Sequence, residues 1–129
     1  MKRTKEFFDK DKFAKYVGLE IVEFGYGYSK IRLKVEKKHL NGVDIAHGGA
    51  IFTLADFAFA VASNSYDDIT ALSINASISY IKAVKENSIL IAQAKEVSKN
   101  RRLAVYNIDI TNENGEIVAA FCGNVYIKK

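Results

Sequence analysis

The sequence predicts an α+β domain in which an antiparallel sheet of about six strands wraps around one long central helix. The segment from Ala50 to Ser65 is apolar on nearly all sides and rich in Ala, Phe and Leu, which is typical of a buried helix. Runs in which apolar and polar residues alternate, typical of strands with one wet face, stand before and after it. A flat sheet would leave one side of so apolar a helix in water, so the sheet has to curve around it, which is the hotdog arrangement.

A short amphipathic helix is predicted near the N-terminus, at about residues 9–17. Phe13, Tyr16 and Val17 follow the i, i+3, i+4 spacing of one helical face, and Gly18 after them is a typical helix stop. We expect this helix to pack on the edge of the structure that follows.

The strands are predicted from alternation of period two. A hairpin spans Leu19–Lys37, with glycines near its turn, and Asn114-Gly115 marks a second tight turn late in the chain. Four further strands are expected after the helix, at Leu72–Tyr80, Ser88–Val97, Leu103–Thr111 and Ile117–Ile127. The chain has no internal repeat or linker, so residues 1–129 are predicted to form a single domain.

The composition limits the classes of protein. Hydrophobic residues make up 49% and charged residues 26% of the 129 residues, as in ordinary globular proteins. The longest apolar run, residues 50–62, contains a charge and is shorter than the about 20 residues of a membrane span, so no membrane association is expected. Cys122 is the one cysteine, with no zinc-type cluster around it. We expect it in the core of a cytoplasmic protein that binds no metal.

The formal net charge of +4 suits an anionic partner. Nucleic acid is disfavoured, because Lys and Arg are scattered over every predicted element without interleaved aromatic residues. His39, beside two lysines, is expected to be exposed and without a function.

Asp56 is the residue that the pattern singles out most clearly, because it is the only charge in the apolar run. Burial of an unpaired carboxylate raises its pKa toward the range of a useful general base. The alternative is a structural role, in which Asp56 bonds to a neighbouring strand or pairs with Lys82 or Arg101.

His47-Gly48-Gly49 stands where the central helix is expected to begin. Amides in the first turn of a helix have no partner within the helix, and the helix dipole favours negative charge there. The two glycine amides could therefore polarise a carbonyl oxygen. A turn that needs glycine for its shape alone would look the same in the sequence.

The segment Asn41–Asp56 resembles the signature of the PaaI-type (phenylacetate-degradation) hotdog acyl-CoA thioesterases. The match includes the fifteen-residue step from Asn41 to Asp56 and the nine-residue step from His47 to Asp56. The order of elements resembles the family over roughly residues 10–127. The resemblance implies hydrolysis of a small to medium acyl-CoA, with aromatic acyl groups included, and no cofactor besides the CoA of the substrate.

The resemblance also assigns roles to residues. Gly48 would hold the thioester oxygen, His47 would orient this turn, and Asp56 would attack directly or activate water. Asn41 would hold the thioester oxygen or the attacking water; an ordinary Asn-Gly turn is the alternative. Ser73 would hold that water, on a strand face shared with Asn75, Ser77 and Ser79; a plain solvent face is the alternative. Residues for CoA binding are also implied: Gly49, Lys99, Asn100, Arg101 and Arg102. A solvated basic turn is the alternative for the last four.

Spacing adds that the site is shared between subunits. Gly48 and Asp56 are eight residues apart, so on one helix they are separated by about 12 Å of rise, too far for both to flank one carbonyl. We therefore expect an obligate homodimer with two equivalent shared sites, and a further pairing into a homotetramer stays open.

Several features leave alternatives open. The chain has no proline, so Ala83-Val84 and Gly42-Val43 stand where the family commonly has proline, which affects the shape of the substrate channel. A non-catalytic acyl-CoA-binding protein on the same fold is the main alternative function. A hotdog enoyl-CoA hydratase is another, with Asp44 and His47 as its acid and base. The large aromatic residues around the helix fill the core or line an acyl pocket: Phe52, Phe57, Phe59 and Tyr66.

Overall fold

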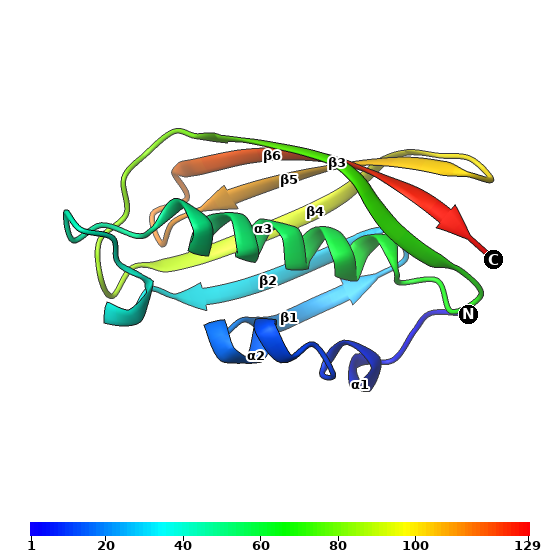
Figure 1. Ribbon diagram of the computed structural model, residues 1–129, viewed down its shortest axis with the longest axis horizontal. Helices are drawn as coiled ribbons and strands as arrows, with labels where there is room; N and C mark the ends of the chain where they lie inside the picture. The colour runs from blue at the N-terminus through cyan, green and yellow to red at the C-terminus, as the bar shows by residue number, and fades with distance from the viewer.

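The computed structural model describes residues 1–129 as one curved sheet with a long helix in its hollow (Figure 1). The helices are α1 (Lys5–Phe8), α2 (Lys12–Val17), the 3-10 helix η1 (Lys37–His39) and α3 (Gly48–Ser63). The strands are β1 (Glu20–Gly25), β2 (Tyr28–Lys34), β3 (Thr70–Tyr80), β4 (Ile89–Lys99), β5 (Leu103–Thr111) and β6 (Ile117–Lys128). All neighbouring strands pair antiparallel, in the order β1-β2-β4-β5-β6-β3.

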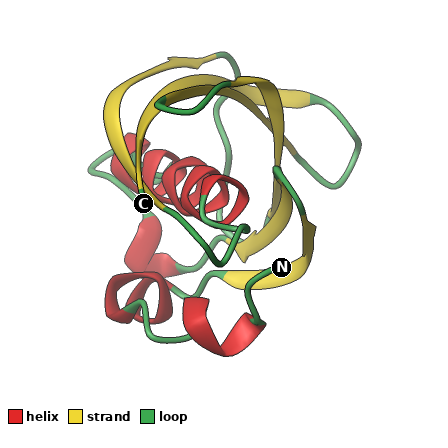
Figure 2. Cartoon of the chain, turned by 90° about the vertical axis from the view of Figure 1, so that its right-hand side faces the viewer, coloured by secondary structure: helices red, strands yellow, loops and turns green.

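The sheet curls around α3, as the view along the helix shows (Figure 2). The inner faces of the strands and most of α3 form one core cluster of 30 buried residues. The predicted α+β hotdog fold is confirmed. The helix begins two residues before the predicted Ala50, because the side chain of His47 caps it, and it ends at Ser63 because the Asn64 side chain bonds to Ala60 and Ala71.

The N-terminal segment differs from the single helix predicted at about residues 9–17. The side chain of Asp11 accepts a hydrogen bond from the Ala14 amide (2.9 Å), so α2 begins only at Lys12, and the separate short helix α1 precedes it. The face of α2 that packs inward carries Ala14 and Val17, whereas Phe13 is 60% exposed. The predicted apolar face is therefore only partly covered within one chain.

A bulge in β3 changes which residues share a face. Ser73 pairs with Val125 and Asn75 with Asn124, so Ile74 is an extra residue without a partner. Val125 is buried, and residues opposite each other in antiparallel strands share a face, so Ser73 lies on the inner face of the sheet. The prediction that Ser73 shares a face with Asn75, Ser77 and Ser79 is wrong, because the bulge turns the later residues outward.

Two further predictions about single residues are wrong. His39 is buried, since its Nδ1 accepts a hydrogen bond from the Glu36 amide (2.8 Å) and its Nε2 donates to the Val17 carbonyl oxygen (2.7 Å). Cys122 is exposed rather than in the core, because Phe121 and Gly123 on either side of it in β6 face inward.

The C-terminal end of α3 is closed by a polar cluster. The carboxylate of Glu96 accepts hydrogen bonds from the hydroxyl groups of Tyr106 (2.8 Å) and Tyr66 (3.2 Å). Burial, followed by the charge of Glu96, raises the pKa of Tyr66 to about 12. Ser65, fully buried, accepts a hydrogen bond from the Gly27 amide and donates to the Ala62 carbonyl oxygen. None of the helices has the length and hydropathy that a membrane crossing requires.

Candidate active site

The N-terminal end of α3 carries one backbone donor without a partner. The Nδ1 atom of His47 accepts a hydrogen bond from the Gly49 amide (2.8 Å), and the carbonyl oxygen of His47 accepts from the amides of Ala50 and Ile51. The amide of Gly48 donates to no group of the chain. Of the two glycine amides predicted as donors, Gly48 is therefore free and Gly49 is already occupied.

Asn41 lies beside this free donor. Its Oδ1 accepts hydrogen bonds from the amides of Val43 (3.0 Å) and Ile45 (3.3 Å), which fixes the loop and leaves the Nδ2 group to point elsewhere. Asn41 and Gly48 both line a cavity of about 340 Å³. The structure thus brings these two predicted residues together.

Tyr80, which the sequence did not single out, forms a wall of the same cavity. Its hydroxyl group donates a hydrogen bond to the carbonyl oxygen of Gly48 (2.9 Å). The bond joins the end of β3 to the start of α3, which are 32 residues apart. No local sequence pattern predicts such a contact for an aromatic residue at the end of a strand.

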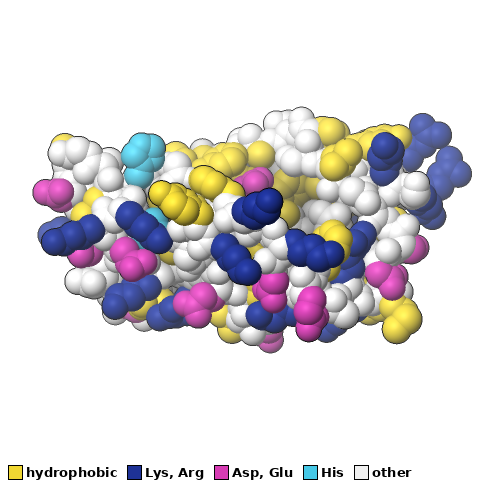
Figure 3. Space-filling view, turned by 60° about the horizontal axis from the view of Figure 1, so that its bottom comes forward, with side chains coloured by type: hydrophobic (Ala, Val, Ile, Leu, Met, Phe, Trp, Pro, Cys, Tyr) yellow, Lys and Arg dark blue, Asp and Glu magenta, His cyan; other side chains and the backbone are white.

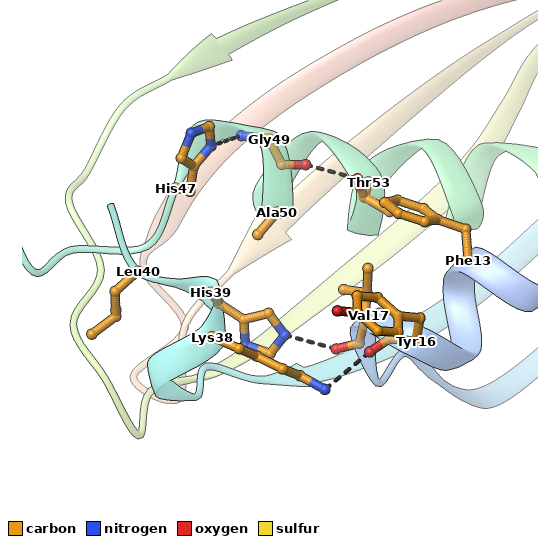
Figure 4. Close-up of a pocket in the computed structure, with 10 residues that line it drawn as sticks. All are labelled: Phe13, Tyr16, Val17, Lys38, His39, Leu40, His47, Gly49, Ala50 and Thr53. Atoms are coloured by element: carbon orange, nitrogen blue, oxygen red, sulfur yellow. Dashed lines mark hydrogen bonds between the residues drawn. The ribbon is translucent and has the colours of Figure 1, made fainter. Parts of the chain in front are cut away.

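A second cavity, of about 260 Å³, lies on the other side of the helix start, between α3, α2 and η1 (Figure 4). Phe13 and Tyr16 of α2 face Ala50 and Thr53 of α3 across it. The C-terminal end of α2 is held in place from η1, since Lys38 donates to the Tyr16 carbonyl oxygen (2.9 Å) beside the bond from His39 to Val17.

Asp56 lies two turns along α3, on its open side. The side chain reaches the surface of the single chain, which differs from the predicted full burial, and it makes no hydrogen bond or ion pair. Lys82 pairs with Glu116 instead (3.4 Å). Partial burial, and then the negative charge of Asp11, raise the pKa of the Asp56 carboxyl group. The structural alternative for Asp56, a bond to a strand or to a cation, is therefore not realised within one chain.

The basic turn from Lys99 to Arg102 lies at the opposite end of the molecule from Gly48 (Figure 1). The Oδ1 atom of Asn100 accepts hydrogen bonds from the amides of Arg102 and Leu103 (both 2.9 Å), so it shapes the turn, and Lys99 Nζ lies 4.7 Å from the centre of the Tyr66 ring. Arg101 and Arg102 are exposed without an ion pair. One chain therefore does not bring the basic turn to the helix start.

Charge is distributed unevenly along the molecule. Seen from the side of α1 and α2, positive and negative side chains intermix over most of the surface, and Lys and Arg gather at the end that carries the β4–β5 turn (Figure 3). An anion that spans both ends of the helix would find donors at one end and cations at the other.

Other predicted groupings are not formed. Nδ1 of His47 is occupied by Gly49, and the carboxylate of Asp44 makes no hydrogen bond, so the acid and base pair of a hydratase is not assembled. Phe57 and Phe59 belong to the buried core, and Phe52 packs against it, so these rings line neither of the two cavities at the helix start. No group of three or more potential ligand side chains is arranged to hold a metal ion.

The curved sheet around α3 defines a hotdog-fold protein, and its candidate site combines a free amide at the helix start with an unpaired carboxylate farther along α3. Comparisons with known proteins agree. The sequence pattern of the Thioesterase superfamily matches residues 44–119, more than half of the chain. The chain therefore belongs to the thioesterase superfamily, and its similarities are to PaaI-like members.

Three relatives illustrate the similarity. A protein of Archaeoglobus fulgidus, named provisionally as an esterase, is 41% identical over 98% of this chain and 82% of its own length. The acyl-coenzyme A thioesterase PaaI of Escherichia coli is 32% identical over 90% of this chain and 82% of its own. The solved structure of E. coli PaaI superposes with a TM-score of 0.90 over 94% of this chain and 87% of its own. A thioesterase-type protein of Streptococcus pneumoniae, solved with coenzyme A, is 27% identical and superposes with a TM-score of 0.88 over 97% of both chains.

Proposed function

We propose that this protein hydrolyses small to medium acyl-CoA thioesters, aromatic acyl groups included, to the free acid and CoA. The observation that carries the proposal is the unpaired amide of Gly48 beside Asn41 at the N-terminal end of α3. The names of the relatives support it, since the E. coli relative is an acyl-CoA thioesterase and the S. pneumoniae relative was solved with coenzyme A.

The helix start supplies the electrostatic part of the chemistry. In the proposed complex the thioester oxygen accepts hydrogen bonds from the Gly48 amide and from Nδ2 of Asn41. Both donors and the helix dipole act on the negative charge that develops on this oxygen when the carbonyl carbon becomes tetrahedral. Loss of one such donor costs about 10²- to 10³-fold in kcat in other acyl-transfer enzymes.

The carboxylate comes from a second subunit in this proposal. The rise between Gly48 and Asp56 is about 12 Å on one helix, and β3 is an edge strand with exposed apolar side chains at Leu72 (49%) and Ile74 (58%). Unpaired backbone groups along this long edge strand, together with the two apolar side chains, favour pairing with another copy. In the proposed dimer, β3 pairs antiparallel with its copy about a two-fold axis, and this pairing would bring the C-terminal half of the partner's α3 near the Gly48 amide. Asp56 of the partner subunit and the partner's basic turn then approach the same substrate.

Two chemical routes fit this arrangement. In one, a carboxylate oxygen of Asp56 attacks the carbonyl carbon, the C–S bond breaks, the thiolate of CoA leaves and takes up a proton, and water hydrolyses the resulting anhydride. In the other, Asp56 removes a proton from a water molecule held by Ser73, and that water attacks. After a single turnover in ¹⁸O-labelled water, ¹⁸O in the Asp56 carboxylate and ¹⁶O from Asp56 in the acid identify the first route, with water attack at the Asp56 carbonyl carbon of the anhydride. Attack of water at the acyl carbon, in either route, places ¹⁸O in the acid.

The cavity between α2 and α3 supports the proposed size of the acyl group. It has a volume of about 260 Å³, and apolar side chains of α2, η1 and α3 form half of its lining. Phe13 and Tyr16 offer aromatic faces there (Figure 4). Rates with phenylacetyl-, benzoyl- and straight-chain acyl-CoA esters would establish the preferred group. A cytoplasmic location and a tetramer built from two dimers remain further parts of the proposal.

Replacement of Asp56 tests the proposed function. Asp56→Asn is expected to lower kcat at least about 10²-fold on every active ester while the dimer persists in size-exclusion chromatography. Asp44→Asn is the matched control, because Asp44 is an exposed carboxylate near the helix start without a proposed role. A fully active, dimeric Asp56→Asn variant would overturn the assignment of Asp56. If the unmodified protein bound CoA esters and left them intact, a non-catalytic acyl-CoA-binding protein would be the correct alternative.

A further inference from the structure

The side chain of Tyr80 points from the end of β3 toward the start of α3. Tyr80 pairs with Ala119 of β6, which is fully buried, so its ring stands on the inner face of the sheet. The ring is close to Gly48: a Cβ atom built on that glycine would lie 3.2 Å from Cζ and 3.3 Å from the hydroxyl oxygen of Tyr80. A side chain at position 48 would therefore crowd the ring and require it to shift slightly.

The peptide unit between Gly48 and Gly49 is held from two sides. Its carbonyl oxygen accepts the hydrogen bond from the Tyr80 hydroxyl group (2.9 Å), and its amide donates to Nδ1 of His47 (2.8 Å). Two consecutive glycines have wide backbone freedom, and the first turn of a helix lacks internal bonds for its amides. The Gly48 amide itself lies in the preceding peptide unit, whose carbonyl oxygen (His47) accepts from the amides of Ala50 and Ile51. The two side-chain contacts therefore add to this restraint from the next peptide unit along the chain.

We propose that Tyr80 is a positioning residue, which orients the free Gly48 amide toward the carbonyl oxygen of the substrate. The inference rests on the proposed function, because it assigns the Gly48 amide to the thioester oxygen. Tyr80 touches Gly48 rather than the reacting atoms, so its contribution is to alignment, and misalignment of a donor lowers kcat more than it weakens substrate binding.

The location of Tyr80 also links the Gly48 amide to the proposed dimer. Tyr80 is the last residue of β3, the edge strand through which the proposed dimer forms. Pairing of this strand with its copy would fix β3, and with it Tyr80 and the Gly48 amide of the same chain. The dimer would therefore supply the partner's carboxylate and also align the donor in each subunit.

The first test is Tyr80→Phe, which keeps the ring against Gly48 and removes only the hydroxyl group. We expect kcat for an acyl-CoA ester to fall about tenfold, with KM changed less than about twofold. Tyr126→Phe is the matched control, since Tyr126 is a comparably exposed tyrosine on the adjacent strand β6 and its hydroxyl group makes no hydrogen bond. An unchanged kcat in a folded Tyr80→Phe variant would overturn the inference.

The second test is a double-mutant cycle between positions 48 and 80. Gly48→Ala places a methyl group against the Tyr80 ring, so we expect a loss of kcat that shrinks at least about threefold when Tyr80→Ala removes the ring. Losses that multiply independently would contradict the proposed contact. Thermal unfolding of each variant checks that the chain is folded.

The Asp56→Asn variant separates the two proposals. Activity that depends on Asp56 but not on Tyr80 would refute the positioning role alone. Activity that is indifferent to Asp56 would refute the proposed site, whatever the Tyr80 variants do.

Discussion

The two ends of α3 differ in whether the polar groups around them are paired. At the C-terminal end, Ser65 and Glu96 satisfy the polar groups around them, and the helix packs tightly against β6. At the N-terminal end the Gly48 amide has no partner, and cavities of about 340 and 260 Å³ lie on either side. The comparison indicates that the closed end stabilises the fold, while the open end leaves a backbone donor without a partner, the donor that the proposed function assigns to the substrate.

Loss of the Glu96 carboxylate should have the largest effect on stability. Glu96→Ala removes the acceptor of two tyrosine hydroxyl groups, and Tyr106 is only 1% exposed, so we expect the free energy of unfolding to fall by about 2–4 kcal/mol. Urea unfolding measures this free energy of unfolding. Glu116→Ala, at a solvent-exposed ion pair, should lower it much less. Equal effects of the two variants would show that the closed end is not the more stabilising one.

Close packing against α3 gives the next effect. A Cβ atom on Gly123 would lie 2.7 Å from two ring atoms of Phe59, whose side chain is only 1% exposed and has no room to move. We expect Gly123→Ala to lower the free energy of unfolding by about 1–3 kcal/mol through overpacking. Differential scanning calorimetry should show a lower Tm. An unchanged Tm would mean that the side chains at the closed end can rearrange to accommodate the extra methyl group.

At the open end, we expect His47→Ala to lower the free energy of unfolding less than the variants at the closed end do, and to lower the activity more. Loss of a helix cap typically costs about 1 kcal/mol, and the freed Gly49 amide would compete for the substrate oxygen in a disordered first turn. Asp11→Ala removes the comparable cap of α2 and is the control. The expected outcome is a similar loss of stability in both variants, with kcat lowered only by His47→Ala.

The smallest effect concerns the pH dependence of activity. Asp56 has to be ionised as nucleophile or base, so activity is lost as pH falls through its raised pKa. Asp11→Asn keeps a capping side chain on α2 but removes the negative charge that contributes to this raised pKa. The acidic limb of the pH profile of kcat should therefore move to lower pH, and only in part, because desolvation is the larger cause. A shift to higher pH would contradict the sign.

Most of the fold could be predicted from periodicity. The apolar length of α3 and the alternation of the strands are local properties, and they also imply that the sheet wraps the helix. The burial of His39 could not be predicted, because it depends on the Val17 carbonyl oxygen at the end of another helix. The contact of Tyr80 could not be predicted for the same reason, since its partner Gly48 is distant in the chain.

The candidate site was predictable in part. Asn41 and Gly48 were expected together, and the structure places both on one cavity. The free state of one glycine amide and the occupied state of the other depend on which way the His47 ring turns, which spacing does not specify. The catalytic and binding roles of these residues, and the shared dimer site, stay predictions.

The extra residue Ile74 has a consequence for how relatives should be aligned. Upstream of it, odd-numbered positions of β3 face the helix, and downstream the even-numbered ones do. A gap-free alignment with a homologue that lacked this insertion would match a residue to Ser73. If the strands were aligned downstream of the bulge, that residue would face outward, and its neighbour would face the helix. Comparisons of specificity within the family should therefore follow the phase of the pleat on each side of the bulge rather than column number.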